Sequence, residues 1–188
     1  MSDFVNTIDL LGDDVVFSKI VDKTITEFKD NVITSVGFYA FANFNNLTSV
    51  DLPNVTNIGG SAFFSCKALA TVKFPFVTTI GEDSFTSCTN LTIADFSSIT
   101  SIGNRAFSNC NKLASLILRG ATIPTLPDRF VMNYTLIVNG IGYIYVPRAL
   151  VDTYKSATNW STYANQFRAL EDYTVDGTIT GALDETKI

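Results

Sequence analysis

The chain has 188 residues, 46% hydrophobic and 16% charged, with a formal net charge of −5, which excludes an intrinsically disordered chain and allows a sizeable core. Its 13 Lys and Arg residues are scattered, so a nucleic-acid partner is not expected. The absence of histidine removes most zinc sites and every catalytic arrangement that needs an imidazole base.

The first predicted element is an N-terminal cap over residues 1–33 that includes a degenerate first coil. Ile25, Phe28 and Ile33 keep part of a pattern that becomes regular after them. The opening residues have neither the basic segment nor the apolar run of a signal peptide, so none is expected. No stretch approaches the roughly 18 apolar residues of a membrane helix, so membrane insertion is not expected either.

Four rows of equal length follow with a period of 22, starting at Thr34, Thr56, Thr78 and Thr100, and they align without a gap. Internal repetition of this length is typical of solenoids. The matching columns are Val36, Ile58, Ile80 and Ile102; Gly37, Gly59, Gly81 and Gly103; Ala40, Ala62, Ser84 and Ala106; Phe41, Phe63, Phe85 and Phe107; Phe44, Cys66, Cys88 and Cys110; Leu47, Leu69, Leu91 and Leu113; Val50, Val72, Ala94 and Leu116; and Leu52, Phe74, Phe96 and Leu118.

Each row predicts one coil made of a helical turn followed by a strand. Ala40, Phe41, Phe44 and Leu47 fall at helical spacing, whereas Val50 and Leu52 alternate as in a strand. One coil is too small to bury its own Phe and Leu side chains, so the coils must stack. The predicted fold is therefore an α/β solenoid with a parallel sheet on one face, short helical turns on the other, and a cap at each end.

Cys66, Cys88 and Cys110 occupy one column, which leaves two interpretations: a thiol metal or redox site, or small buried side chains. Phe44 holds the same column in the first row, which favours burial. Because an odd, sparse cysteine count is not a disulfide framework, we expect no structural disulfide, metal or cofactor.

Adjacent carboxylates occur as Asp13-Asp14, Glu82-Asp83 and Asp184-Glu185, and they are the weak case for a carbohydrate-active enzyme. A glycosidase needs two carboxylates facing each other across a cleft, whereas neighbours at turns are usually solvated. A parallel β-helix lyase would have several short strands in each coil, and we predict one strand and a helical turn. We therefore expect no enzymatic activity.

The repeat region is predicted to continue to residue 147, with an enlarged last coil. The strand at Ile144 and Val146 follows Leu116 and Leu118 by more than one period, so six extra residues are expected within Pro124–Gly142. Short amphipathic helices are predicted at Ala149–Tyr154 and Trp160–Leu170, forming a cap over residues 148–173. Trp160, Tyr163 and Phe167 are spaced to pack on the last coil. Residues 174–188 form a tail of weak periodicity.

The rows resemble the bacterial BspA-type leucine-rich repeat. The resemblance lies in the pattern Ile58-Gly59-x-x-Ala62-Phe63-x-x-Cys66-x-x-Leu69-x-x-Val72-x-Phe74-Pro75, repeated through residues 34–119. The segment Ile144-Tyr145-Val146-Pro147, followed by Ala149-Leu150-Val151-Asp152-x-Tyr154, resembles the closing strand and helix of that family. The resemblance implies an α/β solenoid used for adhesion or recognition, in a family with many exported or cell-surface members.

Strand positions that vary between rows are expected to face outward and to form the binding surface. Toward the C-terminus these positions are apolar, aromatic and basic: Ile93, Ile117, Arg119, Tyr143 and Tyr145. Tyr and Arg are typical interface anchors, so these five residues are the predicted partner-binding patch. The alternative is that the enlarged last coil or the tail covers them.

The sequence thus predicts a non-catalytic binding or adhesion module that recognises a protein or a glycan. The second interpretation is a self-associating component of a surface or prophage-type assembly, and the third is the enzyme. The identity of the ligand, the oligomeric state and the compartment stay open.

Overall fold

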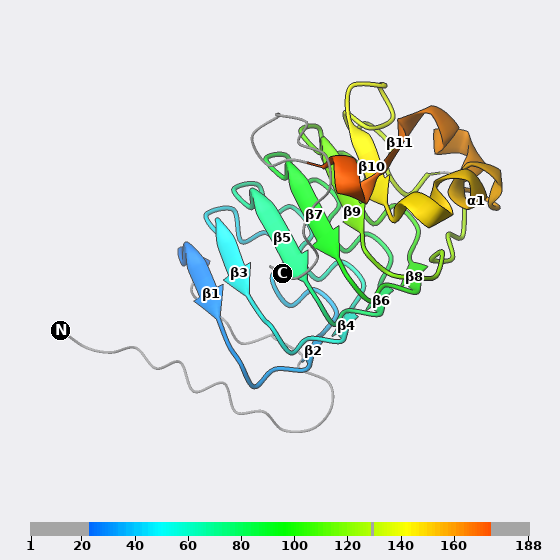
Figure 1. Ribbon diagram of the computed structural model, residues 1–188. Coiled ribbons are helices and arrows are strands. Elements are labelled where there is room, and N and C mark those ends of the chain that lie inside the picture. Colours follow the sequence, from blue (N-terminus) through cyan, green and yellow to red (C-terminus); the bar gives the residue numbers. More distant parts are fainter. Residues whose placement is uncertain (1–22, 129, 174–188) are drawn as a thin grey trace.

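The computed structural model describes residues 23–128 and 130–173, which form a stack of coils closed by a cap (Figure 1). The predicted tail, residues 1–22 of the predicted N-terminal cap, and the pairs Asp13-Asp14 and Asp184-Glu185 lie outside the described residues. The described residues form an α/β solenoid: parallel strands repeat along its length, and its few helices follow the last coil.

The long strands run side by side on one face, which is called the outer sheet below. They are β1 (Glu27–Lys29), β3 (Ser49–Asp51), β5 (Thr71–Phe74), β7 (Ile93–Phe96), β9 (Ser115–Leu118), β10 (Tyr143–Val146) and β11 (Phe167–Ala169). Strands β5, β7, β9, β10 and β11 form one parallel ladder, and β1 pairs separately with β3. Thr71 pairs with Ile93 and Ile93 with Ser115, so each coil places equivalent residues side by side.

A second row of strands, not predicted from the sequence, lines the adjacent face of the solenoid. It comprises β2 (Ser35–Val36), β4 (Asn57–Ile58), β6 (Thr79–Ile80) and β8 (Ser101–Ile102), all parallel. The prediction of one strand in each coil was therefore wrong for these coils. Exposed threonines just before these strands reinforce the stacking: the hydroxyl of Thr78, for example, donates to the carbonyl of Thr56 at 3.1 Å.

The segment predicted to be helical forms two successive turns instead. Tyr39 and Asn43 have φ of 57° and 64°, and the next coil repeats this at Ser61 and Ser65. The left-handed residues turn backbone groups toward the neighbouring coil: the N–H of Phe41 donates to the carbonyl of Ala62 at 2.7 Å. Helical spacing of the apolar residues is also compatible with paired turns, which is why the spacing wrongly predicted a helical turn.

Aromatic rings stacked from coil to coil form the centre of the core. Phe41, Phe63, Phe85 and Phe107 lie with centroids 5.1, 5.2 and 5.3 Å apart and with nearly parallel planes. The matching columns other than the glycine column are buried, except that Val50 in the first complete row is half-buried. The hydrophobic effect acting on these columns holds the coils together.

Glycine is required where consecutive coils approach each other most closely. A Cβ added at Gly103 would lie 2.5 Å from the Gly81 carbonyl carbon and 2.5 Å from the Glu82 nitrogen. A side chain at this column would force the coils apart, so the glycine column sets their spacing.

The three cysteines are buried, as the column pattern predicted. The thiols of Cys66, Cys88 and Cys110 donate to carbonyls of the preceding coil at 3.0 to 3.1 Å. Burial raises the pKa of Cys66 to about 12 and also raises that of Cys88. The column therefore packs the core and satisfies backbone carbonyls.

The last coil is enlarged, but its extra residues are more widely spread than predicted. Leu118 pairs with Phe96, Thr125 with Ser101 and Tyr143 with Ser115. The separation in sequence between partners already exceeds one period at Thr125, so part of the insertion precedes the predicted range Pro124–Gly142. The separation grows again before Tyr143, so the remainder enlarges the loop before β10.

The cap combines helices with one further strand. The 3₁₀ helix η1 (Arg148–Leu150) leads into α1 (Val151–Ser156), followed by η2 (Ser161–Gln166), β11 and η3 (Leu170–Asp172). Trp160, Tyr163 and Phe167 are buried, as predicted. The helix predicted over Trp160–Leu170 is present only over Ser161–Gln166, as a 3₁₀ helix. Phe167 and Ala169 are buried on either side of exposed Arg168, which is strand alternation, so the prediction was wrong for this segment.

Candidate binding surface

The strands of the outer sheet run side by side (Figure 1), and equivalent residues are paired in register within each of its two ladders. The paired positions are Lys29 and Asp51; Lys73, Asp95, Ile117, Tyr145 and Arg168. Charged side chains occupy the strands near the N-terminus, and Ile, Tyr and Arg those near the C-terminus.

The N-terminal half of this surface is open and polar, and we call it the charged strip. It consists of Glu27, Lys29, Ser49, Asp51, Thr71 and Lys73, all of them exposed. The Lys29 ammonium lies 2.6 Å from the Asp51 carboxylate. Exposed ion pairs of this kind contribute little to stability, so Lys29 and Asp51 can replace this contact with contacts to a bound molecule at little cost in free energy.

The C-terminal half is largely covered, which corrects the predicted exposure of Ile117. Ile117 is only 1% exposed, between Asp95 and Tyr145 on the neighbouring strands. Beside it, Arg119 donates two hydrogen bonds of 2.9 Å to the Asp95 carboxylate. Asp95 is buried, and this two-pronged geometry offsets much of the cost of removing its charge from water.

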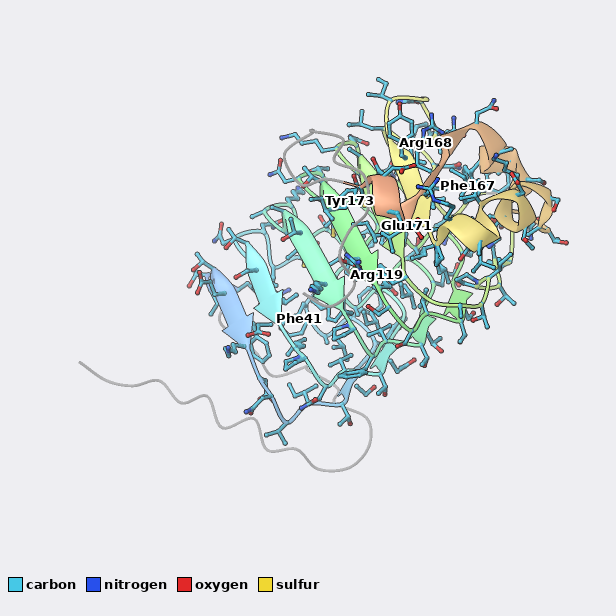
Figure 2. The ribbon with its side chains drawn as sticks, in the orientation of Figure 1. Phe41, Arg119, Phe167, Arg168, Glu171 and Tyr173 are labelled. Atoms are coloured by element: carbon cyan, nitrogen blue, oxygen red, sulfur yellow. The ribbon has the colours of Figure 1, made fainter. Side chains whose placement is uncertain are left out.

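The covering group is a tyrosine cluster, defined here as Tyr143, Tyr145 and Tyr173. The ring of Tyr173 lies 4.6 Å from that of Tyr145, edge to face, so the two rings pack against each other. Burial raises the pKa of both Tyr145 and Tyr173. Figure 2 shows Tyr173 over the outer sheet, on the side where Arg119 lies.

Arg168 completes the cluster from the edge strand β11. Its guanidinium carbon lies 4.2 Å from the centroid of the Tyr143 ring, a cation–π contact. Tyr143 and Tyr145 are both half-buried, with rings 6.3 Å apart. The cluster therefore keeps aromatic and cationic surface in contact with solvent beside the charged strip.

Two sets of contacts hold the segment that carries Tyr173 against the sheet: the strand pairing of β11 and the polar contacts of Arg148. Strand β11 pairs with β10 along its length, and Arg148 lies 2.6 Å from the Asp172 carboxylate. The Glu171 carboxylate also accepts the backbone N–H of Arg148 at 3.2 Å. Because the Arg148 side chain is exposed, the pairing of β11 with β10 is the stronger of the two.

Of the five predicted patch residues, Ile93, Arg119, Tyr143 and Tyr145 are half-buried, and Ile117 is enclosed. The strand register brings all five onto the same face. Sequence reasoning missed Arg168 and Tyr173. The alternation of Phe167, Arg168 and Ala169 was the available signal, and it was read as part of a helix.

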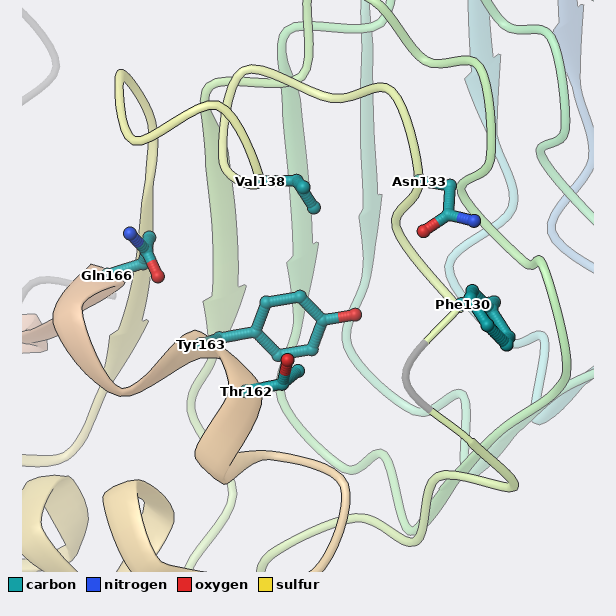
Figure 3. Close-up of a pocket in the computed structure, with 6 residues that line it drawn as sticks. All are labelled: Phe130, Asn133, Val138, Thr162, Tyr163 and Gln166. Atoms are coloured by element: carbon teal, nitrogen blue, oxygen red, sulfur yellow. The ribbon is translucent and has the colours of Figure 1, made fainter.

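A separate hollow of about 150 Å³ lies where the last coil meets η2. It is lined by Phe130, Asn133, Val138, Thr162, Tyr163 and Gln166 (Figure 3). The Tyr163 ring crosses the middle of the view, with its hydroxyl directed toward the segment that carries Phe130 and Asn133. Apart from this phenol, the described lining residues are not ionisable.

The carboxylate pair Glu82-Asp83 lies on a turn, where Arg105 of the next coil binds both residues. The guanidinium lies 2.9 Å from Glu82 and 2.7 Å from Asp83. The hydrogen bond from Arg105 lowers the pKa of Asp83 despite an opposing effect of burial. A carboxylate held ionised by an arginine is a poor general acid, so this pair does not resemble a glycosidase centre.

Within the described residues, no helix is long and apolar enough to cross a membrane. Comparison with curated proteins gave no match to this chain. The sequence profile of the BspA type leucine rich repeat region matches residues 13–135, in six copies. This match spans more than half of the chain, and the stacked parallel strands agree with it. The chain therefore belongs to the BspA-type leucine-rich-repeat family.

Proposed function

We propose that this protein is a non-catalytic recognition module that binds a protein or glycan through its outer sheet. The observation that carries the proposal is the tyrosine cluster, where half-buried Tyr143 and Tyr145 adjoin the Arg168 guanidinium. Aromatic rings and arginine held in place by neighbours give large contact area at small entropic cost.

The charged strip extends the proposed surface toward the N-terminus. Its alternating charges at Lys29, Asp51 and Lys73 favour a partner of complementary pattern and oppose others. Half-buried Ile93 remains part of the proposed surface, buried Ile117 lies under it, and Arg119 fixes Asp95. Membership of a family associated with adhesion and protein interaction agrees with this assignment.

The test is a screen of the purified chain against a glycan array and immobilised cell-surface proteins. Tyr143→Ala removes an anchor, and Lys73→Glu reverses a charge of the strip. Their matched controls are Tyr39→Ala, an exposed tyrosine of the turns, and Lys67→Glu, an exposed lysine in the turn before β5. A hit lost in the two sheet variants and kept in both controls supports the proposal.

A hit that survives both sheet variants contradicts the proposed surface. Absence of any hit, together with a mass that rises with concentration in light scattering, favours the self-associating component instead. Tyr145→Asp is a poorer probe, because Tyr145 packs against Tyr173 and the variant would disturb the cap.

A further inference from the structure

The hollow beside η2 exists because the last coil departs from the repeat. Val138 belongs to the enlarged loop before β10, and Phe130 and Asn133 to the turn that precedes it. Thr162, Tyr163 and Gln166 come from η2 in the cap. The regular coils have neither the enlarged loop nor a helix packed against it, so the hollow is specific to this end of the molecule.

The lining joins apolar surface to neutral hydrogen-bonding groups. Phe130 and Val138 are 43% and 44% exposed, so apolar surface faces the solvent there. Asn133 and Gln166 each offer an amide donor and acceptor, and Thr162 offers a hydroxyl. An apolar guest alone would leave these groups without partners, which costs free energy.

Among the described residues around the hollow, the charges disfavour an anionic guest. None of the six lining side chains is charged at neutral pH, and Asp128 lies near enough to Tyr163 to contribute to its raised pKa. Burial raises the pKa of the Tyr163 phenol to about 12, so the phenol stays protonated at neutral pH. An acidic sugar or a phosphate would find no cation among the described lining residues.

The size of the hollow limits the guest to a single ring. A cavity of about 150 Å³ accommodates a six-membered ring. Sites for larger ligands usually begin at about 300 Å³. Any further part of the ligand must therefore extend into solvent.

We propose that this hollow binds one neutral pyranose ring, such as the terminal sugar of a glycan. The hydroxyls of the ring would pair with Asn133, Thr162 and Gln166, and its C–H face would pack on Phe130 or Val138. This site is separate from the outer sheet, so it stands or falls independently of the recognition surface proposed above. A single ring contacts few atoms, so the dissociation constant is expected to be about 1 mM.

Saturation-transfer NMR and titration calorimetry on the full chain test this site. The probes are methyl glucoside, methyl galactoside, methyl mannoside and N-acetylglucosamine, with glucuronate as the charged comparison and N-acetylphenylalanine amide as the peptide-like one. At least one neutral sugar is expected to bind, and glucuronate at least about fivefold more weakly.

Gln166→Ala is expected to weaken sugar binding by about fivefold or more, whereas Asn165→Ala, its exposed neighbour outside the hollow, leaves binding unchanged. Phe130→Ala is a second variant, at an exposed position that is safer for folding. Three results overturn the proposal: no neutral sugar binds at about 10 mM, only the phenylalanine amide binds, or bound sugar is insensitive to both hollow variants.

Discussion

The regular coils, residues 34–119, and the C-terminal region, residues 120–173, are built in opposite ways: the first by repetition and the second by departure from the repeat. In the regular coils, equivalent residues stack upon each other, as the four-membered phenylalanine column does. In the C-terminal region the spacing between paired strands grows beyond the repeat, and one α-helix, three 3₁₀ helices and the strand β11 follow β10.

The difference shows where each property of the molecule resides. Repetition buries side chains and pairs backbone groups, and it leaves an exposed surface of small polar and charged residues. Irregularity creates the tyrosine cluster and the hollow, both of which require segments distant in sequence. We therefore expect stability to depend mainly on the regular coils, and recognition to need the C-terminal tyrosine cluster together with the charged strip of the regular coils.

The largest effect is expected for Phe85→Ala, in the middle of the stacked phenylalanines. The variant removes a buried ring that contacts Phe63 and Phe107, and should lower the free energy of unfolding by about 3–5 kcal/mol. Urea titration measures the loss. Phe76→Ala is the control, because that ring is 56% exposed and should cost less than about 1 kcal/mol. Equal losses in the two variants would contradict the central role of the column.

Two glycine variants compare the close contact between regular coils at Gly103 with the more open backbone at Gly120, where the C-terminal region begins. Gly103→Ala places a Cβ 2.5 Å from backbone atoms and should cost about 1–3 kcal/mol. Gly120→Ala meets nothing closer than 3.4 Å and should change stability by less than about 0.5 kcal/mol. Thermal unfolding separates them, with only Gly103→Ala expected to lower Tm by at least about 2 °C. A tolerated Gly103→Ala would show that the coils are free to move apart.

Substitution of two aromatic residues of the cap by phenylalanine should change the free energy of unfolding in opposite directions. Trp160→Phe removes the hydrogen bond from the indole N–H to the Pro124 carbonyl, 2.7 Å long and buried, and should destabilise by about 1–2 kcal/mol. The Tyr154 hydroxyl is buried without a hydrogen-bond partner among the described residues, so Tyr154→Phe should stabilise by up to about 1 kcal/mol. Chemical denaturation measures the free energy of unfolding of both variants. A destabilised Tyr154→Phe would indicate that the hydroxyl has a hydrogen-bond partner.

At neutral pH the smallest effect concerns the thiols of the regular coils. Burial raises the pKa of Cys66 from 9.0 to about 12, so folding favours the protonated thiol. Its contribution to stability is complete below pH 9 and is lost as the pH rises toward 12. The native chain should therefore resist a thiol reagent at pH 8 and react fully once unfolded. Rapid labelling of the native chain at pH 8 would mean that the column opens locally.

Much of the fold could be predicted because repetition presents the same evidence four times. The columns of Phe41, Leu47 and Val36 were assigned to the core from spacing alone, and their members are buried. The conformation between them was mistaken, since left-handed residues such as Tyr39 and Ser61 leave no mark on the hydrophobic pattern. Two-residue strands such as Ser35–Val36 are likewise too short to show a period.

The candidate surface was predictable only in part, because its cover comes from far along the chain. Strand alternation placed Tyr143, Tyr145 and Ile117 on one face, and the register agrees. The burial of Ile117 accompanies packing by Tyr173, which follows much later in the chain and has no periodic relation to it. The hollow depends on how one enlarged loop packs against η2, which no sequence pattern encodes.

The parallel stacking of coils fixes the spacing of features along the outer sheet. Each coil adds about 4.8 Å along the stack, and its neighbours on both sides present the same backbone edges. The number of coils therefore sets the distance between the charged strip and the tyrosine cluster, while the chemistry of each stays the same. Gain or loss of one whole coil would change this distance and so suit a partner with differently spaced contact groups. The residues of the charged strip and of the tyrosine cluster would not need to change.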